Sequence, residues 1–234
     1  MDDLIVAIHQ PNLYPWLGYF HKIAKSDTFI FLDDVQIQKT GASYTNRVSI
    51  AVAGSPHHIT APIRRRSGVW NINETELLND RWIEQTTKTL QSTYSKAAHF
   101  LQVRDLIFGL VRYAEPRLSN YNINFITRLS HELGLGAAFR CSSELPLAAA
   151  DPTQRLAALT RSVGGTVYLS GNGAAAYQDE QTFRACDIKM EYIDNSRLQY
   201  HQLGRHAFVP GLSILDAIFN LGIEQTSSLL RSNC

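Results

Sequence analysis

The sequence predicts an α/β fold built on a mainly parallel sheet that is flanked by helices, with a helical segment in the middle of the chain. Residues 4–8 and 29–32 form two short, continuously apolar runs, as expected of strands buried on both faces of a sheet. The segment between them has helical periodicity, so the three match the strand, helix, strand unit of a parallel sheet. Polar residues follow both runs, at the edge where α/β sheets bind ligands.

Local signals set the bounds of this first unit. Pro11 follows the first apolar run, and Pro15 stands where the first turn of a helix tolerates proline, which predicts a helix over residues 15–25. The second run leads directly into Asp33 and Asp34. The whole unit has about the length that a right-handed parallel crossover requires.

The middle of the chain predicts a hairpin followed by helices. Residues 48–52 and 59–63 are expected to pair as two strands joined by a loop. Residues 80–114 have a helical pattern that is broken near 94–99, and residues 120–133 predict another helix, ended by glycine. We therefore expect one domain over 1–234, with a helical subdomain at about 80–135.

The last part of the chain returns to alternating helices and strands. Asp151 is expected to cap a helix over residues 152–163, and the strands 166–169 and 188–193 follow it. Ser213 is expected to cap the final helix. Two further predictions concern ligand binding: a polar loop that begins Ser170-Gly171, and the polar pair Asp216 and Asn220, which lie four residues apart and so on one face of the final helix.

Composition excludes several classes of protein. The 22 Lys and Arg residues balance 21 Asp and Glu, giving a net charge of +1, so nothing favours nucleic acid or an anionic membrane surface as a partner. The three cysteines form no CxxC pair and no disulfide framework, and no stretch reaches the ~20 apolar residues that span a bilayer. We therefore expect a cytoplasmic protein without membrane insertion, whose partner is a small molecule.

His9 and Asp34 are the candidate catalytic residues. An imidazole titrates near neutral pH and can remove or donate a proton, and a carboxylate at the neighbouring strand end is able to orient it or to contact substrate. A pair of acids near His9 and His21 would also permit a divalent metal, but the chain lacks a recognisable ligand spacing, so no metal site is predicted.

The candidate substrate-binding residues are the polar, aromatic and basic side chains near the predicted strand ends and on the final helix. Aromatic rings would pack on a sugar or on a pantetheine-like arm, and basic groups would neutralise phosphate or carboxylate. The alternative for the basic groups is a solvent-exposed position. The set comprises Gln10, Asn12, Tyr14, Trp16, Gln36, Lys39, Asn46, Arg47, Ser170, Gly171, Tyr200, Gln202, Ser213, Asp216 and Asn220.

Familiar catalytic and cofactor motifs are absent from the sequence. There is no GxSxG nucleophile motif and no cysteine in a motif that suggests an activated thiolate. Neither GxGxxG after the first strand nor GxxxxGKS is present. We therefore predict no covalent intermediate and no resident cofactor.

Several uncommon motifs recur in a fixed order along the chain. They are HQPN at 9–12, LGYFHKIA at 17–24, LDDVQ at 32–36, Asn46-Arg47, YLSG at 168–171 and LSILD at 212–216. Together they resemble the pattern of the WbqC-like protein family over essentially the whole chain. Two departures are the Leu13-Tyr14 order, which is inverted, and Ser43-Tyr44-Thr45, which replaces a tryptophan-containing approach to Asn46.

The resemblance implies a role in bacterial surface-polysaccharide (O-antigen) or related small-molecule biosynthesis. It suggests a group transferase that forms an amide or ester bond by moving an acyl or aminoacyl group to an amino sugar or another small amine, with His9 deprotonating the amine. The expected co-substrate is an acyl thioester or ATP, and the partner a nucleotide-linked sugar or a carrier-bound acyl group.

Two alternatives remain open. The strand, glycine-bearing helix, strand order also resembles the opening of HIGH-type nucleotidyltransferases and ligases, but Trp16 and Tyr19 stand where the motif histidines would flank Gly18. The second alternative is a non-catalytic sugar-binding protein of a glycan pathway.

Overall fold

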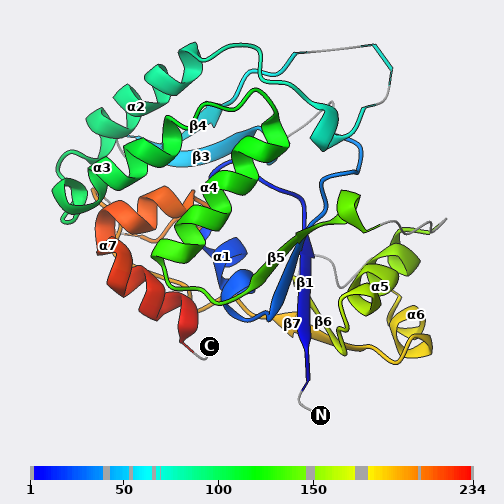
Figure 1. The fold of residues 1–234 in the computed structure, drawn as a ribbon. Helices are drawn as coiled ribbons and strands as arrows, with labels where there is room; N and C mark the ends of the chain where they lie inside the picture. Colours follow the sequence, from blue (N-terminus) through cyan, green and yellow to red (C-terminus); the bar gives the residue numbers. More distant parts are fainter. Residues whose placement is uncertain are drawn as a thin grey trace.

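A five-stranded parallel sheet forms the centre of the protein (Figure 1). The computed structural model describes residues 3–38, 43–52, 55–64, 67–68, 70–145, 151–171, 179–204 and 207–232. The strands, in their order across the sheet, are β5 (Ala138–Cys141), β2 (Thr28–Phe31), β1 (Ile5–His9), β6 (Val167–Gly171) and β7 (Lys189–Ile193). Every neighbouring pair is parallel, which confirms the predicted α/β class.

The order of the strands reverses between β1 and β6. From β1 the chain adds β2 and then β5 on one side, and it later returns to add β6 and β7 on the other side of β1. Such a switch point opens a crevice beyond the carboxyl ends of the two central strands, because their connections leave in opposite directions. The fold thereby positions a site next to the last residues of β1.

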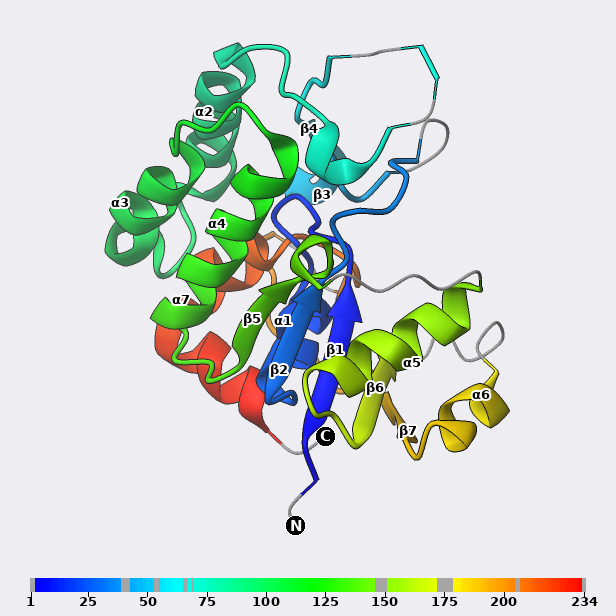
Figure 2. The ribbon, with the colours of Figure 1, turned by 45° about the vertical axis from the view of Figure 1, so that its right-hand side comes forward.

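The helices fall on the two faces of this sheet or beside it (Figure 2). Their bounds are α1 (Leu17–Ala24), α2 (Arg81–Tyr94), α3 (Phe100–Val111), α4 (Leu118–Glu132), α5 (Pro152–Ser162), α6 (Glu180–Ala185) and α7 (Ile214–Arg231), with short 3-10 turns η1 (Ile72–Glu74) and η2 (Ser142–Glu144). Side chains alternate between the faces of a strand. Val6 and Ile8 accordingly belong to a core cluster with residues of α5 and α6, whereas Ala7 belongs to the larger cluster that includes residues of α1, α4 and α7.

A separate antiparallel hairpin lies beside the bundle of α2, α3 and α4. It consists of β3 (Arg47–Val52) and β4 (Ser55–Thr60), with Val48 paired to Ile59. The predicted second strand began at Ile59, whereas β4 begins at Ser55 and its first four residues are exposed. An exposed polar strand has no apolar alternation, so pairing with β3 and not hydrophobicity defines it.

Other differences from the sequence prediction are local. β5 was not predicted; it forms because Ala138 to Cys141 pair with β2. α6 was also missed, since it is short and mostly exposed. Ser170 and Gly171, expected in a loop, are the last residues of β6. No helix among the described residues is long and apolar enough to cross a membrane.

Candidate functional site

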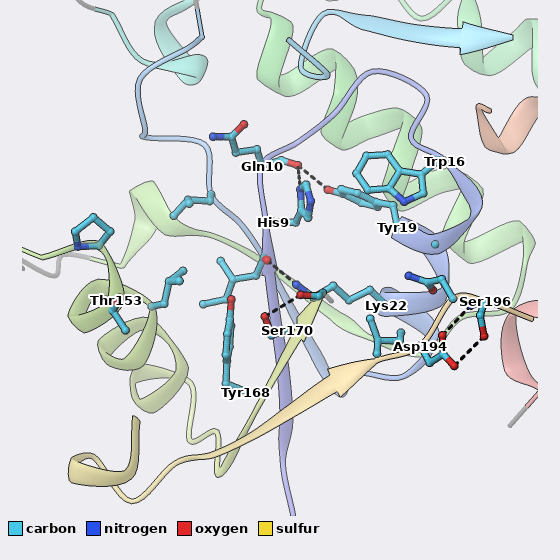
Figure 3. A pocket seen from close by; sticks show the side chains of 18 residues that line it. His9, Gln10, Trp16, Tyr19, Lys22, Thr153, Tyr168, Ser170, Asp194 and Ser196 are labelled. Atoms are coloured by element: carbon cyan, nitrogen blue, oxygen red, sulfur yellow. Dashed lines mark hydrogen bonds between the residues drawn. The ribbon is translucent and has the colours of Figure 1, made fainter. Parts of the chain in front are cut away.

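A pocket of about 910 Å³ opens at the switch point of the sheet (Figure 3). It lies beyond the carboxyl ends of β1, β6 and β7, between α1 and the first turns of α5. The lining residues are Ile8, His9, Gln10, Trp16, Gly18, Tyr19, Lys22, Leu32, Pro152, Thr153, Leu156, Tyr168, Ser170, Gly171, Ile193, Asp194, Asn195 and Ser196. Its size suits a ligand as large as a nucleotide or a sugar derivative.

His9, the last residue of β1, is held against the aromatic side of this pocket. Its Nδ1 lies 3.1 Å from the backbone oxygen of Gln10, and its ring packs edge-on against Tyr19 and Trp16 at centroid distances of 4.8 and 5.6 Å. Burial lowers the pKa of His9 to about 4, and the charge of Lys22 contributes in the same direction. The imidazole is therefore neutral at pH 7.

The contact with Gln10 also selects the tautomer of that neutral ring. A carbonyl oxygen only accepts, so Nδ1 carries the hydrogen and Nε2 keeps its lone pair. Tyr19 donates its hydroxyl to the same carbonyl at 2.9 Å, which fixes the acceptor in place. Among the described residues Nε2 has no hydrogen-bond partner, so it is available to accept a proton from a ligand.

Lys22 contributes a cation to the pocket. The residue is 6% exposed, its Nζ donates to the backbone oxygen of Ile8 at 3.0 Å, and it lies 5.8 Å from the centroid of the Tyr168 ring. Desolvation lowers the pKa of Lys22 to about 8. Gly18 and Lys22 are four residues apart on α1, which places both on the face that lines the pocket.

The segment that follows β7, with Asp194, Asn195 and Ser196, forms another wall of the pocket. Asp194 accepts hydrogen bonds from the backbone nitrogen and hydroxyl of Ser196 at 2.8 and 2.9 Å, and these contacts lower its pKa. The Oδ1 of Asn195 lies 2.9 Å from Nδ1 of His21. Asn195 approaches α1 so closely that a Cβ at position 18 would stand 2.9 Å from its Nδ2, so glycine is needed there.

A second pocket of about 250 Å³ adjoins the first. The two share Trp16, Gly18 and Asn195 as a common wall. Its other lining residues are Leu17, Leu198, Tyr200, Phe208, Val209, Pro210, Gly211 and Leu212. This mostly apolar pocket would take an apolar or ring-shaped part of a ligand.

The structure brings some of the sequence-predicted site residues together. His9, Gln10, Trp16, Ser170 and Gly171 line the large pocket, and Tyr200 lines the adjoining one. Residues from β1, from the loop before α1 and from β6 therefore meet, as expected from the carboxyl ends of neighbouring parallel strands.

Asp34 lies outside the pocket lining. Its carboxylate is paired with Nη2 of Arg155 at 2.5 Å and also accepts a hydrogen bond from the hydroxyl of Ser142. The neighbouring Asp33 accepts hydrogen bonds from the backbone nitrogen and hydroxyl of Ser143 at 3.0 and 2.7 Å. Both acids thus tie the end of β2 to other elements, and Asp34 anchors α5, whose first turns line the pocket.

The predicted residues of the final helix form a buried polar cluster next to the smaller pocket. Asp216, 1% exposed, accepts hydrogen bonds from the hydroxyls of Tyr94 and Tyr200, both at 2.8 Å. Asn220 donates to the backbone oxygen of Asp216 and accepts from the backbone nitrogen of Leu203. These contacts fix the segment that carries Tyr200.

Two other predicted residues position backbone in the same region. The side chain of Gln202 makes two hydrogen bonds to the backbone of Val209: its Oε1 accepts from the backbone nitrogen at 2.8 Å, and its Nε2 donates to the backbone oxygen at 3.0 Å. Ser213 caps α7 as expected and donates its hydroxyl to the backbone oxygen of Tyr14 at 2.7 Å.

The remaining predicted residues are spread over the molecule. Tyr14 and Asn12 are buried, and Tyr14 packs in the core against Phe125. Asn46 donates to the backbone oxygen of Ala61. Gln36 and Arg47 are exposed outside the pocket lining, and Lys39 lies outside the described residues.

Sequence reasoning missed Lys22 and Asn195 as site residues. A signal for Lys22 existed, because it shares the face of Gly18 on a helix whose neighbouring positions are mostly apolar. Asn195 had no such signal, since it follows a strand by two residues in an ordinary polar turn.

The donor set of the pocket fits an organic ligand better than a metal ion. Within the described parts of the chain, no three His, Cys, Asp or Glu side chains are grouped so that they could hold a metal. The pocket instead offers an imidazole acceptor, an ammonium group and an amide.

Comparison with known proteins gave one family and one curated relative. The model of the WbqC-like protein family matches residues 10–228. An uncharacterized protein of Mycobacterium tuberculosis, Rv1507c, is 32% identical over 221 residues, which cover 94% of each chain. No solved structure gives a significant match.

Proposed function

The chain belongs to the WbqC-like protein family, and from this premise we propose that it is a group transferase that moves an acyl or aminoacyl group to an amino sugar or another small amine. The matched residues 10–228 include most of the pocket-lining set. The proposal places the reaction in the large pocket, within cytoplasmic biosynthesis of a bacterial surface polysaccharide or a related small molecule.

The observation that supports this function best is the state of His9. Its Nδ1–H is committed to Gln10, while Nε2 has no partner among the described residues and belongs to a pocket-lining ring. A general base must be unprotonated and within reach of the proton that it removes. The low pKa of His9 ensures the first condition at neutral pH.

The amine nitrogen of the acceptor attacks the carbonyl carbon of the donor, a thioester or activated ester, and the bond to the leaving thiol or alcohol breaks. His9 Nε2 takes the proton from the amine and passes it to the leaving group. Asn195, whose Oδ1 lies 2.9 Å from His21 Nδ1, has its amide group at the common wall and is the proposed donor to the developing oxyanion.

The aromatic residues beside His9 are the proposed sugar-binding surface. Trp16 and Tyr19 lie edge-on to each other at 5.8 Å and both line the large pocket. Apolar ring faces pack well against the C–H face of a sugar, and the polar side chain of Gln10 lines the same pocket beside them.

The test combines a ligand screen with one substitution. Purified protein is screened by thermal stabilisation against acyl thioesters, aminoacyl donors, nucleotide-linked amino sugars and ATP, and pairs of hits are incubated and analysed for product by mass spectrometry. We expect a transfer product from the wild type, and a loss of at least ~100-fold in turnover with binding retained in His9→Ala.

His57→Ala is the matched control, because His57 is exposed on β4 and lies outside both pockets. Full turnover in His9→Ala would contradict the assigned base. Binding of an amino sugar without any product across the donor panel would favour the non-catalytic sugar-binding alternative.

The order of the strands favours a second candidate, ATP-dependent nucleotidyl transfer. The sheet adds two strands on one side of β1 and two on the other, an arrangement that nucleotide-binding α/β folds use, with the ligand at the switch point. Release of pyrophosphate from ATP in the presence of an acceptor would establish this reaction in place of direct acyl transfer.

A further inference from the structure

Lys22 is a buried cation without an acidic partner in the described part of the chain. Its side chain emerges from α1, and the residue is 6% exposed. Its one hydrogen-bond partner is the backbone oxygen of Ile8, and no ion pair involves it among the described residues. Burying a charge is costly unless it is paired, so an anion that binds beside this ammonium group would lower that cost.

The groups that surround Lys22 do not supply the missing negative charge. β1 contributes His9, which is neutral, and β6 contributes the ring of Tyr168 at 5.8 Å. The pocket-lining part of α5 is Pro152, Thr153 and Leu156, none of which is charged. The acid of the lining is Asp194, which is exposed, accepts hydrogen bonds from Ser196 and forms no ion pair with Lys22 among the described residues.

We propose that Lys22 binds an oxyanion group of the substrate, a phosphate or a carboxylate, inside the large pocket. This inference rests on the proposed function, and it names the substrate class that the site accepts: a small molecule with a negatively charged group beside the reacting centre. The ammonium group has three donor hydrogens, one of which is engaged by Ile8, so two remain for the oxyanion.

The position of Lys22 also couples substrate charge to the base. The positive charge of Lys22 is one cause of the low pKa of His9. An oxyanion bound to Lys22 offsets that charge, so the pKa of His9 rises when the anionic substrate binds. A stronger base is thus obtained in the complex, where the proton transfer takes place.

The experiment measures anion binding and not turnover. Wild type, Lys22→Met and the control Lys96→Met are compared by thermal denaturation and calorimetric titration with inorganic phosphate, pyrophosphate, citrate and ATP, at matched ionic strength set with chloride. Lys96 is an exposed lysine between α2 and α3, outside both pockets. Lys22→Gln is made in parallel, because a glutamine keeps a donor for Ile8 if methionine impairs folding.

We expect at least one of these anions to stabilise the wild type and Lys96→Met, and to bind about tenfold or more weakly to both Lys22 variants. A response to phosphate, pyrophosphate or ATP identifies a phosphoryl ligand, and a response to citrate alone identifies a carboxylate. Equal responses in wild type and both Lys22 variants, or no response of the wild type to any of the four, overturn the proposal. These measurements detect binding and need no product. The anion-binding proposal can therefore fail or succeed independently of the transferase proposal.

Discussion

The guanidinium Nη2 of Arg155 lies 2.5 Å from Oδ2 of Asp34, so α5 is fastened to the segment that follows β2. Both side chains are about a quarter exposed, at 23% and 24%. Pro152, Thr153 and Leu156 of the same helix line the large pocket. The pair therefore ties the helix that forms one wall of the pocket to the end of β2.

Breaking this pair should affect stability and ligand binding in the same way whether Asp34 or Arg155 is substituted. Asp34→Asn and Arg155→Met are each expected to lower the free energy of unfolding by about 1–2 kcal/mol, a value between those of exposed and buried pairs. Because both variants remove one interaction, the double variant should be little worse than either single one. Urea denaturation and ligand titration measure this cycle. A far larger loss of turnover in Asp34→Asn than in Arg155→Met would indicate that Asp34 contacts substrate.

Acidification should destabilise the protein through His9. Burial lowers the pKa of this residue from 6.5 to about 4. Between these values the unfolded chain binds a proton that the folded chain does not, so the free energy of unfolding falls as the pH drops from 6.5 to 4, by up to about 3 kcal/mol. Denaturation at a series of pH values should show a shallower dependence in His9→Ala than in His57→Ala. Identical slopes in the two variants would contradict the burial of a neutral imidazole.

Gly18→Ala should damage the site without unfolding the protein. The added Cβ would lie 2.9 Å from Nδ2 of Asn195 and 3.1 Å from Nε1 of Trp16, so the common wall of the two pockets must shift. Ligand affinity or turnover is expected to fall on the order of tenfold or more. Gly109→Ala is the control, because nothing lies within 4 Å of a Cβ at that helical position. Unchanged ligand binding in Gly18→Ala would mean that Asn195 does not contact the ligand.

Tyr94→Phe should destabilise the folded protein, because the buried carboxylate of Asp216 loses a hydrogen-bond donor. The Tyr94 hydroxyl donates to Oδ1 of this carboxylate at 2.8 Å, and burial together with the negative charge raises the pKa of the tyrosine far above its usual value. Loss of a hydrogen bond to a buried charge is expected to lower the free energy of unfolding by about 1.5–3 kcal/mol. Tyr113→Phe, at a half-buried tyrosine, serves as the control. Urea denaturation that shows no difference between the two would contradict this role.

Much of the fold could be predicted because its signals are local. The apolar runs of β1 and β2 and the periodicity of α1 lie within single segments, and the structure confirms all three elements. The caps predicted at Asp151 and Ser213 are also confirmed, since each side chain accepts hydrogen bonds from its own helix. A cap depends on residues two or three positions away, so sequence alone is sufficient to define it.

β5 shows the limit of such signals. Ala138 to Cys141 alternate between exposed and half-buried positions, and the hydrogen bonds that make them a strand come from Thr28 to Phe31, far away in the chain. Such a strand is defined by its partner and not by its own composition. The same reason explains β4, whose polar first residues pair with β3.

The α/β class, the strand, helix, strand unit that begins the chain and the family to which the chain belongs could all be recognised from the order of amino acids alone. Which polar residues share a pocket could be seen only in the folded chain: Lys22 and Asn195 line the large pocket, whereas Asp34 and Asp216 make contacts outside it. The physical reason is that helical and strand periodicity are properties of neighbouring residues, whereas a pocket depends on how strands and helices from distant parts of the chain pack together.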